Sequence, residues 1–381
     1  MTPVTTPLKQ QQTDHFLFVD ALRALAAIYV VTYHMVLVPR PILAIPPVLN
    51  DLVMAGGSGV ALFFVLSAFT LSMSMAKKNI NLASIQDFYV RRIFRIVPLF
   101  LVWLGLSLIR DQQLFSKIPS WKEIVLNLSF LFNFFPGSHQ GIVWASWTIG
   151  VEMLFYAIFP IVFWYGNSIR RCLFLLALTI GAEFVFQTVL ESSAILPSTK
   201  ASFSHMNIMH SLPLFIMGLL GFHIYQYLRL AAIPRKYGYA LCALSLTGLV
   251  GLSLMNSSFE SFQGSYWNLY AASYLGLTLG LAFTPCRVLV NRFTVFLGEI
   301  SYSLYLNHPT ILYLLSPVYV FIGSLSSGLM MFGLCFLVSM LSLTGVSVLT
   351  HRFIEVPGMA LGQKWINRMK ARRQLQASLG V

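Results

Sequence analysis

Long apolar runs recur along this chain and restrict it to folds that a lipid bilayer surrounds. Of its 381 residues, 57% are hydrophobic and only 10% are charged, whereas soluble domains carry about 25% charged residues. Runs of about 20 apolar residues are long enough to cross the hydrocarbon core as α-helices. They lack the alternation, over about ten residues, of transmembrane β-strands. The sequence therefore predicts an all-α, polytopic membrane helix bundle.

The apolar runs and the basic loops between them predict about ten transmembrane helices with both termini in the cytoplasm. The arrangement places most of the 25 Lys and Arg residues on the cytoplasmic side, as the positive-inside rule requires. This rule also accounts for the net charge of +13 without a nucleic-acid partner. The predicted helices cover residues 16–38, 57–76, 96–110, 146–165, 172–190, 208–228, 237–255, 267–284, 296–315 and 329–350.

The predicted helices divide the chain into a cytoplasmic head (1–15), a membrane domain (16–358) and a basic cytoplasmic tail (359–381). The basic, aromatic stretch 88–98 is expected in the cytoplasm, before the third helix. Residues 111–145 are harder to assign, because their apolar run is short for a span. We interpret them as a re-entrant or interfacial excursion on the outer side.

The first helix carries three ionisable residues, Asp20, Arg23 and His34. Such side chains are costly in a bilayer and usually face the bundle interior or a wet cavity. Arg23 and His34 are eleven residues apart, close to three helical turns, so they share one stripe over a rise of about 16 Å. Asp20 lies on the same side. This stripe indicates a reaction or transport path from one surface toward the midplane.

A basic cluster, Arg91, Arg92 and Arg95, precedes the third predicted helix. On a helix Arg92 and Arg95 share a face, and two guanidiniums on one face form a fork suited to phosphate. The alternative is a cytoplasmic anchor for anionic lipid head groups.

Two later segments add polar residues inside predicted helices. The segment 147–156 contains Trp147 and Glu152, and a lone carboxylate in a span is a functional candidate or a structural partner for a neighbouring cation. The segment 297–309 places polar side chains on one helix, where they line a cavity or pair with polar residues opposite; its candidate residues are Ser301, Tyr302, Tyr305 and His308. The four cysteines are widely spaced and predict no metal site.

Taken together, these motifs resemble the acyltransferase 3 family of integral membrane O-acyltransferases. Six pieces match in order across nearly the whole chain: D-x-x-R-x(10)-H from Asp20, the glycine-rich run 56–69, R-x-x-R-I-x-P from Arg92, W-x-x-x-x-E-x-x-F-Y from Trp147, ISYSLYLxH from Ile300, and R-F-I-E-x-P from Arg352. Three positions depart from the family pattern, namely Ala24, Ala68 and Val356.

The resemblance implies a bacterial inner-membrane enzyme that transfers an acyl group, usually acetyl from acetyl-CoA, to a sugar hydroxyl. The implied partners are acyl-CoA, membrane lipid, and a lipid-linked or polymeric carbohydrate such as lipopolysaccharide O-antigen or exopolysaccharide. By position, His34 matches the family's essential histidine and Arg23 its partner. Arg92 and Arg95 match the arginines implicated in handling the CoA end of the donor.

The sequence leaves two mechanisms open for His34. It acts as general base on the sugar hydroxyl, or it accepts the acyl group first in a covalent relay. Two other function classes fit parts of the sequence. One is a multi-helix transporter of a sugar or lipid-linked sugar without acyl transfer, and the other is a membrane sensor or scaffold.

Overall fold

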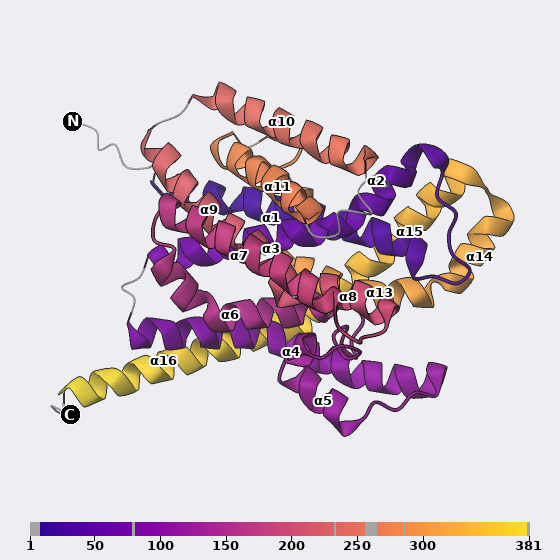
Figure 1. The fold of residues 1–381 in the computed structure, drawn as a ribbon, viewed down its shortest axis with the longest axis horizontal. Coiled ribbons are helices and arrows are strands. Elements are labelled where there is room, and N and C mark those ends of the chain that lie inside the picture. Colours follow the sequence, from indigo (N-terminus) through magenta and orange to yellow (C-terminus); the bar gives the residue numbers. More distant parts are fainter. Residues whose placement is uncertain (1–7, 78–80, 232–233, 256–264, 285, 379–381) are drawn as a thin grey trace.

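The fold was analysed in a computed structural model that describes residues 8–77, 81–231, 234–255, 265–284 and 286–378. These residues form helices and connecting turns, and no β-strand occurs among them. The predicted all-α class is therefore confirmed. Figure 1 shows a bundle in which the start of α1 and the end of α16 lie at the same end.

The helices in chain order are α1 (Leu8–Leu37), η1 (Pro47–Leu49), α2 (Asn50–Met54), η2 (Ala55–Ser58), α3 (Gly59–Ala76), α4 (Leu82–Phe115), α5 (Trp121–Leu128), η3 (Phe132–Phe134), α6 (Trp147–Tyr165), α7 (Ile169–Glu191), α8 (Pro197–His205), α9 (Ile208–Leu230), α10 (Arg235–Leu254), α11 (Ser265–Phe283), α12 (Arg292–Glu299), α13 (Ser301–Leu314), α14 (Ser316–Leu325), α15 (Gly328–Thr350), η5 (His351–Glu355) and α16 (Val356–Ser378).

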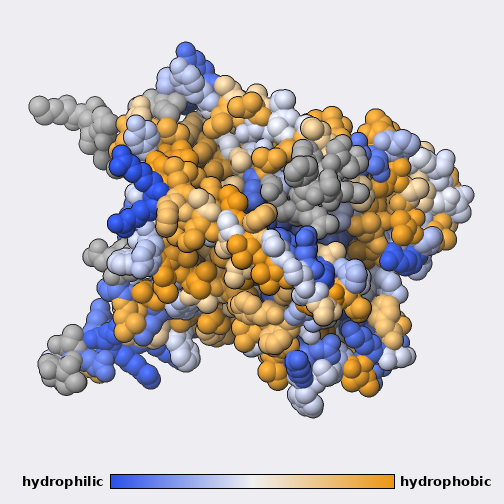
Figure 2. Space-filling view, viewed as in Figure 1, coloured by the Kyte–Doolittle hydropathy of each residue, from blue (hydrophilic) through white to orange (hydrophobic). Residues whose placement is uncertain are grey.

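Eight helical segments in the described residues are long and apolar enough to cross a membrane, and a ninth if α13 and α14, bent by 60°, count as one span. The predicted number was about ten. The difference is α11, which coincides with the predicted helix 267–284 but is not among these segments. Figure 2 shows hydrophobic residues over the middle of the visible face and hydrophilic residues gathered at the end where α16 terminates. A multi-pass membrane bundle is the architecture.

The third span begins earlier than predicted, because α4 starts at Leu82 rather than near residue 96. Asn81 caps it: its side chain accepts from the Ser84 backbone N–H at 2.8 Å, and the Ser84 hydroxyl accepts from the Asn81 N–H at 3.0 Å. Such a capping box satisfies N–H groups that a helix start leaves open. The helix then continues through Pro98, so the basic stretch 88–98 is helical and not a connecting segment.

The α4–α6 loop (residues 116–146) contains no described helix long enough to span a membrane, since α5 has only eight residues. Two buried asparagines hold it in place. Asn127 accepts from the Ile142 backbone N–H at 2.9 Å, and Asn133 donates to the carbonyls of Trp147 and Met206, both at 3.0 Å. At the start of α5, hydrogen bonds from Ser120 lower the pKa of Glu123. The loop is thus a hydrogen-bonded cap at the end of the bundle opposite the chain ends (Figure 1).

Three other predicted boundaries differ from the observed ones. α1 begins at Leu8, so residues 8–15 of the predicted head are helical, and residues 1–7 lie outside the described residues. The helix predicted over 296–315 is broken at Ile300 into α12 and α13. The helix predicted over 329–350 continues through the π-helical turn η5 into α16. The predicted tail 359–381 is therefore helical as far as Ser378, and α16 packs along α4, with Gly358 and Gly362 close to Phe94.

Glycines let neighbouring helices approach the backbone of α1. A Cβ on Gly59 would lie 2.8 Å from the Ala26 carbonyl oxygen, and one on Gly56 would lie 2.5 Å from the Tyr29 carbonyl oxygen. A Cβ on Gly298 of α12 would collide with the Asp20 backbone. Small residues at such crossings permit close backbone contact between membrane helices.

We expect Gly298→Ala to destabilise the protein, because its methyl group has no space against the Asp20 backbone. Overpacking a tight contact costs about 1–3 kcal/mol. The measurement is the thermal unfolding midpoint of detergent-purified protein. Gly333→Ala is the matched control, since a Cβ there meets nothing within 4 Å. Equal midpoints for the two variants would show that the α1–α12 crossing is looser than described.

Candidate functional site

A cavity of about 270 Å³ opens among α1, α3 and α4, beside the end of α3 and the first half of α4. We call it the basic vestibule. It is lined by Val19, Asp20, Arg23, Thr70, Ser74, Lys77, Arg92 and Arg95. Arg92 and Arg95 both line this space, as two residues three apart on one helix can.

A second space of about 70 Å³, the inner chamber, lies deeper in the bundle. It shares Arg23, Thr70, Arg92 and Arg95 with the basic vestibule, so the two spaces meet at these four residues. Glu152 projects into it from α6 and accepts hydrogen bonds from the Ser67 hydroxyl at 2.7 Å and from the Tyr156 hydroxyl. The vestibule and chamber form one polar route into the membrane domain.

The charges along this route do not cancel. Arg23 pairs with Asp20 at 3.4 Å and donates to Thr70 at 3.4 Å. The Arg92 guanidinium lies 5.7 Å from the Tyr156 ring centroid, within cation–π range. Arg95 makes no ion pair with any described residue. Three guanidiniums thus face two carboxylates, Asp20 and Glu152, and the excess positive charge favours an anionic ligand.

A third cavity, the distal pocket, has about 200 Å³ and lies on the other side of the inner chamber. His34 lines it, with its Nδ1 atom 2.9 Å from the Val30 carbonyl oxygen. A neutral imidazole that donates from Nδ1 keeps its lone pair on Nε2. The His34 ring contacts His308, with centroids 4.7 Å apart. The other lining residues are Val38, Gln140, Gly141, Trp144, Ala145, Trp147, Met206 and Pro309.

A thin wall separates the inner chamber from the distal pocket. Its centre is a hydrogen bond of 2.8 Å between the hydroxyls of Thr148 and Tyr305. The Tyr305 hydroxyl also lies 3.3 Å from the carbonyl oxygen of Ala145, which lines the distal pocket. Phe63 packs edge-on against the Tyr305 ring at 5.7 Å. Arg23 and His34 share a helical stripe, but they face different compartments.

The polar residues of α13 have two roles, since some line the inner chamber and others join α13 to neighbouring helices. Ser301, Tyr302 and Tyr305 line the inner chamber, and Tyr302 also donates to the Ile96 carbonyl at 2.8 Å. On another side of α13, Asn307 accepts from the Trp103 indole at 2.7 Å. That side joins α13 to α4 and α15 and is structural.

The structure brings together most of the predicted site residues but not all of them. Arg91 lines none of the three cavities. Its guanidinium lies 3.7 Å from the Asp87 carboxylate, which also faces Lys370 and Arg373 of α16. Trp147 lines the distal pocket rather than the chamber. His308 lines none of the three cavities and reaches the site through its ring contact with His34.

Sequence reasoning missed several lining residues. Tyr156 lies one helical turn after Glu152, and this spacing was a usable signal. Ser67 and Thr70 occupy α3, where only the glycines were noted. Gln140 and Trp144 lie in the α4–α6 loop, where no periodic pattern indicates which side chains face inward.

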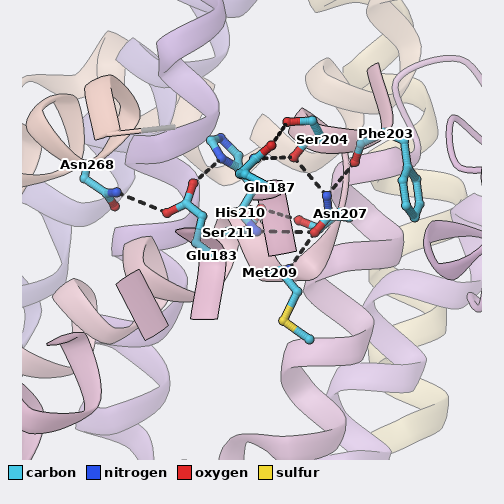
Figure 3. Close-up of polar contacts among 9 residues, drawn as sticks. All are labelled: Glu183, Gln187, Phe203, Ser204, Asn207, Met209, His210, Ser211 and Asn268. Atoms are coloured by element: carbon cyan, nitrogen blue, oxygen red, sulfur yellow. Dashed lines mark hydrogen bonds and ion pairs between the residues drawn. The ribbon is translucent and has the colours of Figure 1, made fainter. Parts of the chain in front are cut away.

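A separate polar cluster lies between α7, α8, α9 and α11 (Figure 3). Glu183, with 4% of its surface exposed, accepts from His210 Nδ1 at 2.7 Å and from the Asn268 amide at 3.3 Å. Asn207 caps α9 by accepting from the Met209 backbone N–H at 2.8 Å. None of these residues lines the three cavities. We interpret the cluster as a structural clamp that ties α7 to the bundle.

The chain was compared with known proteins. A family model described as an acyltransferase domain, of the acyltransferase 3 type, matches residues 16–351. A protein of Staphylococcus aureus (strain COL) named "Putative O-acetyltransferase" is 23% identical over 91% of this chain and 58% of its own length. A protein of Bacillus subtilis (strain 168) named "Putative peptidoglycan O-acetyltransferase" is 27% identical over 81% of this chain and 50% of its own length. The chain thus spans half or slightly more of these relatives. No solved structure shows significant similarity.

Replacing Glu183 by Leu is expected to lower the thermal unfolding midpoint, because His210 and Asn268 would lose their buried acceptor. An unsatisfied buried polar group costs about 1–3 kcal/mol. Glu183→Gln keeps an acceptor oxygen and should lose less. Glu191→Leu, at an exposed position of the same helix, is the control. A Glu183→Leu midpoint equal to that of the control would contradict the clamp.

Proposed function

The chain belongs to the acyltransferase 3 family, and from that premise we propose that it is a membrane O-acyltransferase that moves an acyl group, acetyl from acetyl-CoA, to a sugar hydroxyl. The observation that carries this proposal is the arrangement of cavities. An arginine-lined route and a histidine-lined pocket adjoin at the Thr148–Tyr305 pair, which lines the route and contacts Ala145 of the pocket.

The basic vestibule suits the donor. CoA carries several phosphate charges, and Arg23, Arg92 and Arg95 supply an excess of positive charge there. Guanidinium groups bind phosphate through paired, charge-assisted hydrogen bonds. In this proposal the vestibule faces the cytoplasm, where CoA occurs, and the pantetheine arm lies along the inner chamber toward the wall. The chain would then reside in the bacterial inner membrane with both ends in the cytoplasm.

The distal pocket suits the acceptor. We assign His34 as the general base: its Nε2 takes the proton from the sugar hydroxyl while the hydroxyl oxygen bonds to the thioester carbonyl carbon. The carbon–sulfur bond then breaks, and the CoA thiolate receives the proton from His34. The products are an O-acyl sugar and free CoA. The alternative order, with the acyl group first on His34, uses the same nitrogen.

The acceptor we propose is a surface carbohydrate. O-antigen and exopolysaccharide units are the leading classes from the family resemblance. The name of the Bacillus subtilis relative adds peptidoglycan. All of these are lipid-linked or polymeric carbohydrates that offer a sugar hydroxyl. In this proposal they lie on the side of the membrane that the distal pocket faces.

His34→Ala is expected to reduce transfer of labelled acetyl from acetyl-CoA to extracted glycan by at least about 100-fold, the usual contribution of a general base. The assay measures label in glycan and release of free CoA thiol in membranes. His223→Ala is the matched control, because His223 binds the Gly166 carbonyl and lines none of the three cavities.

Equal transfer by the His34 and His223 variants would remove His34 from the chemistry. An acetylated wild-type protein trapped without acceptor, and lost in His34→Ala, would establish the covalent relay in place of direct transfer.

Arg95→Gln is expected to weaken the use of acetyl-CoA but not of S-acetylpantetheine, which lacks the CoA phosphates. Loss of one charge-assisted hydrogen bond of about 1.5–3 kcal/mol lowers kcat/KM for acetyl-CoA by roughly 10- to 100-fold. Arg368→Gln, on the exposed surface of α16, is the control. A parallel decrease for both donors would place Arg95 away from the phosphates.

A further inference from the structure

We infer that the distal pocket is a carbohydrate subsite in which Trp144 stacks on one neutral sugar ring and Gln140 binds its hydroxyl groups, so that an adjacent hydroxyl reaches His34. This inference rests on the proposed function and deepens it, because it names the residues that select the acceptor.

The chemistry of the pocket lining favours an uncharged, hydroxyl-rich ligand. The lining holds two indoles, Trp144 and Trp147, one amide, Gln140, and one imidazole, His34. It contains no Asp, Glu, Lys or Arg. Ligand sites commonly combine aromatic surface with a few placed polar groups. Sugar rings match this pattern, because they present apolar C–H faces and polar hydroxyl edges.

The basic vestibule and the distal pocket also differ in charge. The basic vestibule holds three arginines, whereas the distal pocket holds no formally charged residue. The anionic end of CoA therefore has its partners only on the vestibule side. With about 200 Å³, the pocket is smaller than the 300–1,000 Å³ of typical sites for drug-sized ligands, which fits a single ring.

Trp144 is held rigidly before any ligand arrives. The Arg110 guanidinium carbon lies 3.9 Å from the centroid of its ring, and Asp111 fixes that guanidinium through hydrogen bonds of 2.7 and 2.8 Å. Phe115 and Tyr313 flank the indole, with ring centroids at 5.9 and 5.5 Å. A pre-organised aromatic surface binds with little loss of conformational entropy.

Three polar groups of the pocket have no protein partner among the described residues. They are the Gln140 side-chain amide, the Trp144 indole N–H and the Nε2 atom of His34, and all three belong to residues that line the same space. An amide and an indole N–H suit sugar hydroxyls as donors and acceptors. His34 Nε2 suits the hydroxyl that reacts. Aromatic surface, hydrogen-bonding groups and base thus converge in one pocket.

The backbone of the loop also positions this surface. Gly141 and Ala145 have positive φ angles of 80° and 61°. A non-glycine residue in this conformation is uncommon and clusters at ligand sites. The carbonyl of Ala145 contacts Tyr305 in the wall. The segment that carries Trp144 is therefore in direct contact with the wall between the inner chamber and the distal pocket.

The test uses full-length protein in membranes, with acetyl-CoA and the oligosaccharides released from the glycan that the wild type labels. Trp144→Ala and Gln140→Ala should each raise the acceptor KM, the former by at least about tenfold, as for loss of a central aromatic contact. The donor KM should change less than twofold. Trp144→Phe keeps a ring against Arg110 and should lie between wild type and Trp144→Ala. Trp121→Phe, 80% exposed on α5, is the control.

A second measurement separates binding from folding and from chemistry. The same oligosaccharides should raise the thermal midpoint of purified wild type and Trp121→Phe without acetyl-CoA, and this shift should disappear in Trp144→Ala and shrink in Trp144→Phe. If both Trp144 variants keep the wild-type acceptor KM and the wild-type midpoint shift, the carbohydrate subsite is wrong. The proposed function would still stand in that case, provided that the wild type acetylates glycan. Transfer by the wild type to a lipid alcohol and not to glycan would overturn the carbohydrate subsite. Absence of any transfer by the wild type would reject the proposed function itself.

Discussion

The close approach of neighbouring helices to the backbone of α1 determines where the ionisable groups of this bundle lie. Gly56 and Gly59 meet α1 from one side, and Gly298 meets it beside Asp20. Each contact is possible only because a Cβ is absent. Protein therefore surrounds α1 closely, and its polar stripe faces cavities inside the bundle instead of lipid. This arrangement makes Arg23 and His34 tolerable in a membrane span, where uncompensated ionisable groups are costly.

The sequence was sufficient to predict the helical membrane bundle and much of the route through it. Spacing on a helix placed Arg92 beside Arg95, and both line the basic vestibule. Spacing also placed Arg23 and His34 on one stripe, but the structure puts them in different compartments. Helical periodicity predicts the direction in which each side chain leaves the helix axis, but it does not predict which other helices pack between two turns. Here Tyr305, from a helix far along the chain, bonds to Thr148 in the wall between the two compartments.

Other features were not predictable, for physical reasons that differ. The start of α4 was visible in principle, because Asn81 and Ser84 have capping-box spacing, but the basic stretch 88–98 was assigned to the cytoplasm and the helix to 96–110. For the α4–α6 loop, the lack of a spanning helix was predicted but its shape was not predictable. Its shape depends on hydrogen bonds from Asn127 and Asn133 to distant backbone groups, and these have no local sequence signature. The position of Trp144 follows from that shape.

The wall between the compartments has a consequence for any reaction that joins substrates from the two sides. An open tunnel through the bundle would let water and ions pass. A wall of packed hydrocarbon would be costly to open. This wall contains the hydroxyl–hydroxyl bond between Thr148 and Tyr305, the contact of Tyr305 with the Ala145 carbonyl, and the edge of Phe63. Each hydrogen bond contributes about 0.5–1.5 kcal/mol net, whereas displacing the Tyr305 ring, which is buried against Phe63 and His308, would also disrupt packing. In the proposed reaction, the thioester and the sugar hydroxyl lie on opposite sides of Thr148 and Tyr305, so these side chains must rearrange before the two groups meet.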